Sequence, residues 1–132
     1  MIGLDTNVLL RYLVRDDVKQ LAQAAHLIEQ QLSVEEPGFV SLVVLAEVVW
    51  NLLSNYEFSR EELITALERL LSIESLALQN SKEVSETIEA MRTGTASFPD
   101  ALIGYLSLAA GCTTTYTFDR KASRLPGFTL IA

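Results

Sequence analysis

The fold is decided by the stretch IGLDTNVLLRYL, residues 2–13. Residues 2–4 form a short apolar run that we expect to be a buried strand, and the apolar residues from Val8 to Leu13 follow the spacing of a helix. Asp5 therefore lies where a strand passes into a helix, which is where open α/β sheets bind their ligands. An acid at such a point is more often only the N-cap of the helix. Acids later in the chain decide between the two interpretations.

The chain has 132 residues, and we expect residues 1–132 to form a single domain with a core of its own. Although 49% of the residues are apolar, no apolar run approaches the roughly 18 residues of a membrane span, so no membrane association is expected. The first residues lack the pattern of an export signal, and we expect a cytoplasmic protein.

Cys112 is the only cysteine and His26 the only histidine. An internal disulfide, a zinc site of the usual histidine and cysteine ligands, and a histidine-based catalytic triad are therefore excluded. The apolar neighbours of Cys112 predict that its thiol is buried in the core rather than reactive.

The net charge of −7 argues against a protein that holds nucleic acid by its overall charge, because such proteins usually carry a basic surface. It does not exclude a protein that does chemistry on nucleic acid. Carboxylates gathered in one pocket and neutralised by divalent cations would make the formal charge a poor guide to the site.

Helices and strands are predicted to alternate along the chain. Asp17, Ser41 and Ser59 are each placed to cap a helix, and Ser59 begins a capping box with Glu62. Helices are expected from about 18 to 32, 41 to 54, 59 to 72, 81 to 92 and 99 to 110, and strands at 39–40, 76–78, 113–118 and 128–131. This alternation predicts an α/β fold with a mostly parallel sheet covered on both faces.

Glu47 is the most informative acid, because the residues on either side of it, LVVLA before and VVW after, are apolar. A carboxylate in an apolar helix would cost several kcal/mol of folding free energy unless it were paired or protonated. We therefore expect a cation or a cleft at Glu47.

Asp100 and Asp119 complete the set of acids. Asp100 stands in the first turn of a helix, where a capping box with Ser97 is an equally good interpretation, and Asp119 follows a predicted strand as Asp5 does. Strand ends in a parallel sheet point the same way, so these acids can meet at one edge. Ligand sets of oxygen atoms alone suit Mg²⁺ or Mn²⁺, which bind phosphate oxygens. The sequence thus predicts a phosphoryl-transfer pocket.

The pattern LDTNVLL at residues 4–10, Glu47 in an apolar helix, DALI at residues 100–103 and TFDR at residues 117–120 resembles the PIN-domain nucleases, and among them the VapC-type toxins. The resemblance covers nearly the whole chain. It implies a PIN-like three-layer α/β/α sandwich with a central, mostly parallel sheet. It also implies a Mg²⁺- or Mn²⁺-dependent endoribonuclease that is the toxin of a toxin-antitoxin pair.

By the same resemblance, the catalytic and metal-binding acids are Asp5, Glu47, Asp100 and Asp119. Thr117 matches the hydroxyl residue two positions before the last acid, and the first motif contributes Thr6 and Asn7. Relatives often carry a further acid three positions before the third one, where this chain has Ser97. That departure puts the occupancy of a second metal in doubt more than the activity.

We expect a metal-bound water to attack the RNA phosphodiester in line. Basic residues close to the acids in sequence are candidates for guiding the substrate backbone, above all Arg11 and Arg120, although solvated surface charge is the more common role of such residues. The other basic candidates are Arg15, Arg92, Lys121 and Arg124.

Two other functions remain open. A phosphatase of the haloacid-dehalogenase kind also places an acid after its first strand, but it needs a second Asp where this chain has Asn7. A non-catalytic PIN-fold domain that binds RNA or protein would keep the fold and some of the acids.

Partners are predicted from an excess of apolar residues on the helices around and after Glu47. These residues cannot all be assigned to one small core, so some should line a homodimer interface or an antitoxin groove. They are Val43, Trp50, Leu53, Leu67 and Leu71. In VapC-like systems the antitoxin lies over the active site, and one of its basic side chains could pair with the acids.

Overall fold

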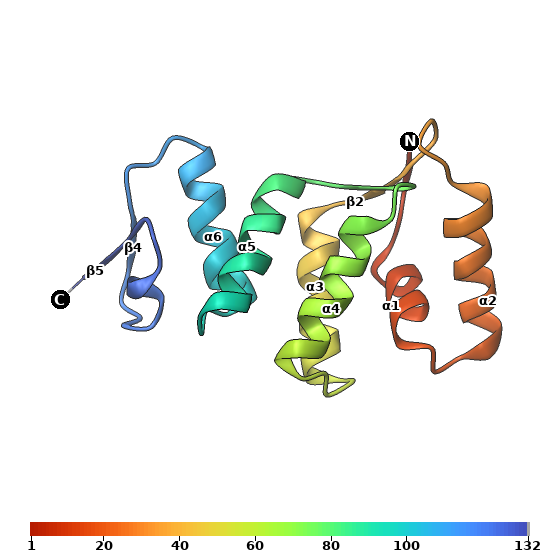
Figure 1. Cartoon of the computed structure of the whole chain (residues 1–132), viewed down its shortest axis with the longest axis horizontal. Coiled ribbons are helices and arrows are strands. Elements are labelled where there is room, and N and C mark those ends of the chain that lie inside the picture. The colour runs from red at the N-terminus through yellow and green to blue at the C-terminus, as the bar shows by residue number, and fades with distance from the viewer. Residues whose placement is uncertain (132) are drawn as a thin grey trace. The chain divides into compact units, whose positions relative to one another are not determined.

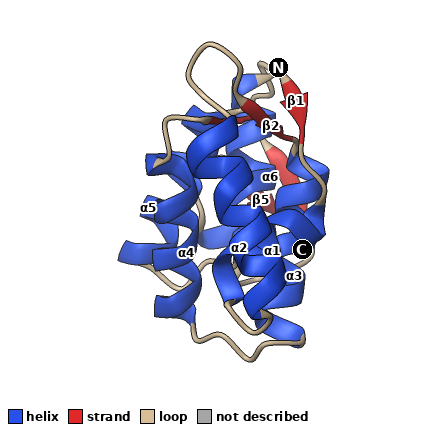
Figure 2. Ribbon diagram, turned by 90° about the vertical axis from the view of Figure 1, so that its right-hand side faces the viewer, coloured by secondary structure: helices blue, strands red, loops and turns tan. Residues whose placement is uncertain are grey.

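The computed structural model describes residues 1–131. The chain divides into two compact units, Met1–Ser81 and Lys82–Ala132. Figure 1 shows the first unit in red to green and the second in green to blue. Helices make up most of the molecule and the strands are short (Figure 2).

The first unit contains a sheet of three parallel strands in the order β1, β2, β3. The strands are β1 (Ile2–Gly3), β2 (Gly38–Val40) and β3 (Leu76–Leu78). Four α-helices lie between them in sequence: α1 (Thr6–Val14), α2 (Val18–His26), α3 (Leu42–Ser54) and α4 (Arg60–Ser72). Parallel pairing follows from these helical crossovers, because a parallel strand cannot be reached by a tight hairpin.

The four helices α1 to α4 each begin at a side-chain cap that the sequence supplies. Asp5, Asp17, Ser41 and Ser59 all have extended backbone conformations and accept a hydrogen bond from a backbone N–H at the start of their helix. At Ser59 the reciprocal bond from the backbone N–H to Glu62 is also present, which confirms the predicted capping box.

The core of the first unit is built from one face of each helix. Leu9 of α1, Val48 and Leu52 of α3, and Leu67 of α4 are almost completely buried. Leu71 is only half-buried, whereas Val43, Trp50 and Leu53 are exposed. The apolar residues of α3 therefore do not all belong to the core. This agrees with the prediction that they are too many for one small core.

The second unit contains the helices α5 (Ser81–Thr93) and α6 (Phe98–Ala109) and a sheet of two parallel strands, β4 (Thr115–Thr117) and β5 (Phe128–Leu130). Tyr116 pairs with Thr129 in this sheet. A short 3₁₀ helix, η2 (Ala122–Arg124), connects the two strands. A Cβ atom at Gly104 of α6 would lie 2.5 Å from the ring of Phe128, so this glycine lets strand β5 approach the helix.

The predicted α/β class with parallel strands is confirmed, and the predicted helices and strands all form within a few residues of their expected ends. One helix differs in kind. The predicted helix from 18 to 32 changes at Leu27 into a π-helix, η1 (Leu27–Gln31), which the periodicity of apolar residues does not reveal.

Two predictions about burial are wrong. Strand β1 was expected to be buried, but Ile2 and Gly3 are exposed, because β1 is an edge strand with β2 as its single neighbour in the sheet. Cys112 was expected to be a core thiol, but it is exposed, because it follows Gly111 in the turn between α6 and β4. Among residues 1–131, no helix is both long enough and apolar enough to cross a bilayer.

Candidate active site

Thr6 brings the two acids of the first unit together. Asp5 is the N-cap of α1, and its Oδ1 accepts a hydrogen bond of 2.8 Å from the Thr6 backbone N–H. The Thr6 hydroxyl donates a hydrogen bond of 2.9 Å to Oε1 of Glu47, on α3. Thr6 itself is buried, so its position is fixed by packing. A single threonine therefore contacts both carboxylates, one through its backbone and one through its side chain.

Both carboxylates of this pair keep a free oxygen. Within residues 1–131, Oδ2 of Asp5 and Oε2 of Glu47 accept no hydrogen bond, and neither acid forms an ion pair with a lysine or arginine. Hard oxygen atoms without a neutralising cation are what Mg²⁺ or Mn²⁺ binds. The donor set of this half of the candidate site thus fits a divalent metal.

Glu47 is not enclosed by apolar side chains, contrary to the expectation from its sequence neighbours. It is exposed, because α3 turns only part of its surface, including Leu45 and Val49, toward the core and leaves Ala46, Glu47 and Trp50 outside. The apolar neighbours in sequence lie on other faces of the helix, since successive residues are rotated around its axis. The carboxylate is solvated, and its hydrogen bond with Thr6 rather than burial gives it a defined position.

Asp119 and Thr117 form a local turn in the second unit. The Asp119 backbone N–H donates a hydrogen bond of 3.0 Å to the Thr117 hydroxyl at the end of β4. Oδ1 of Asp119 accepts hydrogen bonds of 2.8 Å from the Lys121 N–H and 3.3 Å from the Ala122 N–H. Asp119 therefore holds the start of the 3₁₀ helix, and its exposed carboxylate still has a second oxygen that accepts no hydrogen bond from the described residues.

Asp100 lies in the first turn of α6, where its backbone N–H donates a 3.3 Å hydrogen bond to the hydroxyl of the N-cap, Ser97. The capping interpretation is thus correct for the backbone. The Asp100 carboxylate is half-buried and forms no hydrogen bond or ion pair within residues 1–131. The positive end of the helix dipole lies at this first turn, where negative side chains are favoured.

The basic residues proposed for substrate contact differ in how firmly they are held. Arg120 is exposed, and its guanidinium donates no hydrogen bond to the described part of the chain, although its backbone carbonyl accepts one from the Ser123 hydroxyl. Arg11 is fixed by three side chains: its Nε donates to Gln20 at 2.5 Å, and its Nη1 donates to Tyr56 at 3.1 Å and to Asp16 at 3.4 Å. The hydrogen bond with Tyr56 raises the pKa of Arg11 above its ordinary value.

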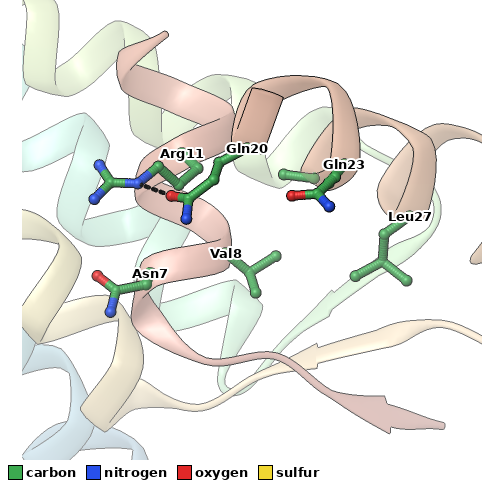
Figure 3. A pocket seen from close by; sticks show the side chains of 7 residues that line it. Asn7, Val8, Arg11, Gln20, Gln23 and Leu27 are labelled. Atoms are coloured by element: carbon green, nitrogen blue, oxygen red, sulfur yellow. Dashed lines mark hydrogen bonds between the residues drawn. The ribbon is translucent and has the colours of Figure 1, made fainter. Parts of the chain in front are cut away.

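Asn7 and Arg11 line a pocket between α1 and α2 (Figure 3). Gln20 and Gln23 line the same pocket, and neither belongs to a motif of the sequence. Glutamines on an exposed helix give no signal of their own in a single sequence. Only the packing of α2 against α1 brings them to the pocket that Asn7 also lines.

The four predicted acids thus occur as two pairs, one in each unit. Asp5 and Glu47 are joined by Thr6 in the first unit, whereas Asp100 and Asp119 belong to the second. Within either unit, no three acidic, histidine or cysteine side chains of residues 1–131 gather as a metal-binding group.

The family model of the PIN domain matches residues 2–127. The chain belongs to the PIN domain family. The match spans both units, from strand β1 to the turn before strand β5. A search of curated proteins found no significant match.

PIN domains are generally nucleases and typically use divalent metal ions. In this PIN domain, each of the four acids retains at least one carboxylate oxygen that accepts no hydrogen bond from residues 1–131. These residues fit the metal that the family typically uses. Two threonines contact these acids: the Thr6 hydroxyl donates to the Glu47 carboxylate, and the Thr117 hydroxyl accepts from the Asp119 backbone N–H.

Proposed function

We propose that the protein is a Mg²⁺- or Mn²⁺-dependent endoribonuclease whose metal is held by Asp5 and Glu47 of the first unit and Asp100 and Asp119 of the second. The observation that carries this proposal is the Asp5–Thr6–Glu47 arrangement, in which buried Thr6 holds two carboxylates that keep free oxygens. The family model supports it further, because it spans both units and hence both pairs of acids. Residues 1–132 then act as a single nuclease domain.

A divalent metal bound at these acids would lower the pKa of a coordinated water and so supply the nucleophile at neutral pH. The protein positions the ligands for that chemistry. The Thr6 hydroxyl occupies Oε1 of Glu47, so Oε2 would be the oxygen available to a metal. The two backbone N–H groups that bind Oδ1 of Asp119 orient its carboxylate in the same way. Side chains that are already held in place lose less conformational entropy when a metal and RNA bind, so binding is less costly in free energy.

Thr117 and Arg120 flank Asp119 and would contact the substrate phosphate. The Thr117 hydroxyl accepts a bond from the Asp119 N–H, which leaves its own hydrogen available as a donor to a phosphate oxygen. Arg120 is exposed and can pair with the RNA backbone. Contacts of this kind position RNA without reading its sequence.

We further propose that the protein is the toxin of a toxin-antitoxin pair, cytoplasmic and dimeric. The exposed apolar side chains of α3 support a protein interface there, since Val43 is 72% exposed and Trp50 62% exposed. Glu47 lies on the same exposed part of α3. A small antitoxin bound to this surface would cover the acid and could pair with it through a basic side chain.

Cleavage of a labelled single-stranded RNA by the purified protein tests the proposal. Activity should require Mg²⁺ or Mn²⁺, stop with EDTA, and fall at least about 100-fold in Asp5→Asn, Glu47→Gln, Asp100→Asn and Asp119→Asn. Asp17→Asn is the matched control, because Asp17 is also a helix N-cap and Asn caps helices equally well. If the wild-type protein binds RNA but cleaves none under any of these conditions, the proposal is wrong and the protein is a non-catalytic binding domain.

A further inference from the structure

The pocket between α1 and α2 is lined by four polar side chains, and two of them, Arg11 and Gln20, are joined by a hydrogen bond. Its volume is about 260 Å³, just below the range of about 300–1,000 Å³ that accommodates drug-sized ligands, so it suits a smaller planar group. Asn7 and Arg11 come from α1, and Gln20 and Gln23 come from α2 (Figure 3).

The amide groups around this pocket have unused hydrogen-bonding capacity. Arg11 is only a donor, so the oxygen of the Gln20 amide must face it and the amide nitrogen must point elsewhere, with both of its N–H donors unused in the described part of the chain. The side chains of Asn7 and Gln23 make no hydrogen bond within residues 1–131 and can each offer a donor and an acceptor. Amides of this kind pair with the edges of nucleobases.

Arg11 gives the pocket a rigid edge. Its guanidinium is held at once by Gln20, Asp16 and Tyr56, so its plane has little freedom to turn. Planar guanidinium groups stack on bases and attract the adjacent phosphates. The remaining lining of the pocket is apolar and consists of Val8, Ala24 and Leu27, which can contact the face of a flat ring.

The pocket lies beside the acids of the first unit. Asn7 is in the first turn of α1, the helix that Asp5 caps, and Arg11 is one turn further, about 6 Å along the axis. A base bound here would therefore belong to a nucleotide near the phosphate at which a metal held by Asp5 would act.

We propose that this pocket binds one base of the RNA substrate and reads its hydrogen-bonding edge through Asn7, Gln20 and Gln23. The inference rests on the proposed ribonuclease function and adds a sequence preference to it. Single-stranded RNA exposes the edges of its bases, so three amides in one pocket can distinguish among them. The pocket is a specificity site, separate from the acids that would carry out cleavage.

Sequencing the ends produced from a randomised single-stranded RNA tests the specificity. Wild-type protein should prefer one base at a fixed position near the cut, and Gln23→Leu and Gln20→Leu should each reduce that preference at least about fivefold. Gln23→Leu is the cleaner variant, because the side chain of Gln23 makes no hydrogen bond within residues 1–131 that the substitution would remove. Gln30→Leu is the matched control, since Gln30 is exposed on η1 outside the pocket. An unchanged preference in both pocket variants would overturn the proposal.

Binding without catalysis separates this proposal from the proposed function. The side-chain amide signals of Gln20 and Gln23 in ¹H–¹⁵N NMR spectra should shift when one of the four nucleoside 5′-monophosphates is added to metal-free protein, and ribose 5-phosphate should not shift them. If the shifts occur but no RNA is cleaved, the base-binding pocket is supported and the ribonuclease function is refuted. If ribose 5-phosphate causes equal shifts, or no nucleotide causes any, the base-binding pocket is refuted even when the protein cleaves RNA.

Discussion

The Thr6 hydroxyl donates a hydrogen bond of 2.9 Å to the Glu47 carboxylate, across 41 residues of sequence. The same threonine donates its backbone N–H to Asp5. Thr6 is 8% exposed, so the contact that orients Glu47 comes from a well-packed residue rather than from a mobile surface group. The short strand β1 and the cap of α1 thus determine where an acid on α3 is held.

Replacing Thr6 with Val should weaken metal binding while keeping the fold. Valine has the shape of threonine but no hydroxyl, so Glu47 loses its hydrogen bond, at a cost of about 1 kcal/mol in the free energy of unfolding. Loss of such an orienting partner reduces metal affinity about 10- to 100-fold. Calorimetric titration with Mn²⁺ measures the change. Thr6→Ser keeps the hydroxyl and should bind Mn²⁺ nearly as well as wild type; equal weakening in both variants would mean that packing, not the hydrogen bond, matters.

Two glycines in neighbouring strands should respond differently to alanine. A Cβ atom at Gly38 of β2 would lie 2.7 Å from a methyl group of Leu32 and 2.8 Å from one of Leu4, whereas a Cβ atom at Gly3 of β1 has no atom within 4 Å. Gly38→Ala should therefore lower the free energy of unfolding by about 1–3 kcal/mol. Gly3→Ala should leave it unchanged or raise it slightly, because alanine reduces the entropy of the unfolded chain. Denaturant unfolding of both variants measures the difference, and equal stability would show that Leu4 and Leu32 move aside freely.

Local signals explain why so much of the fold follows from the sequence. The start of α4 is specified by Ser59 and Glu62, which are three residues apart in the chain, and the start of α6 by Ser97. Such caps depend on neighbours in sequence and not on the rest of the fold. The π-helical turn after His26 has no comparable signal.

Burial was harder to predict, because it depends on which face of an element meets another one. Glu47 has apolar neighbours in sequence but lies on an exposed face of α3, and Cys112 follows a turn at Gly111. The candidate acids could be named from their order along the chain. Thr6 was recognised as part of the first motif, but its contact with Glu47 depends on how α3 packs against α1. Gln20 and Gln23 belong to no motif, and only that kind of packing brings them to the pocket.

Tyr12 should make stability sensitive to alkaline pH. Burial raises the pKa of the Tyr12 phenol, and its 2.6 Å hydrogen bond to Glu29 raises that pKa further, while nearby Arg69 lowers it in part. A pKa raised in the folded state means that the neutral phenol stabilises the fold fully below the unfolded pKa of about 10. That contribution is lost as the pH rises through the higher, folded value.

The free energies of unfolding of wild type and Tyr12→Phe, measured between about pH 8 and pH 11, check this prediction. The phenylalanine variant should be less stable at the lower pH, because it lacks the bond to Glu29, and the gap should narrow above about pH 10. The other tyrosines are present in both proteins, so their ionisation changes both free energies of unfolding equally and leaves the difference unchanged. A gap that is constant across the whole range would show that the Tyr12 phenol does not change its pKa on folding.

Direct measurement of Mn²⁺ binding tests the central claim, that acids from both units hold one metal. Titration calorimetry should give a site in wild type that Asp5→Asn in the first unit and Asp119→Asn in the second each weaken at least about tenfold, while the control Asp17→Asn leaves it unchanged. The double variant Asp5→Asn, Asp119→Asn should show no remaining site of comparable affinity. Wild-type affinity in Asp119→Asn, with loss in Asp5→Asn, would contradict the account, because the metal would then belong to the first unit alone.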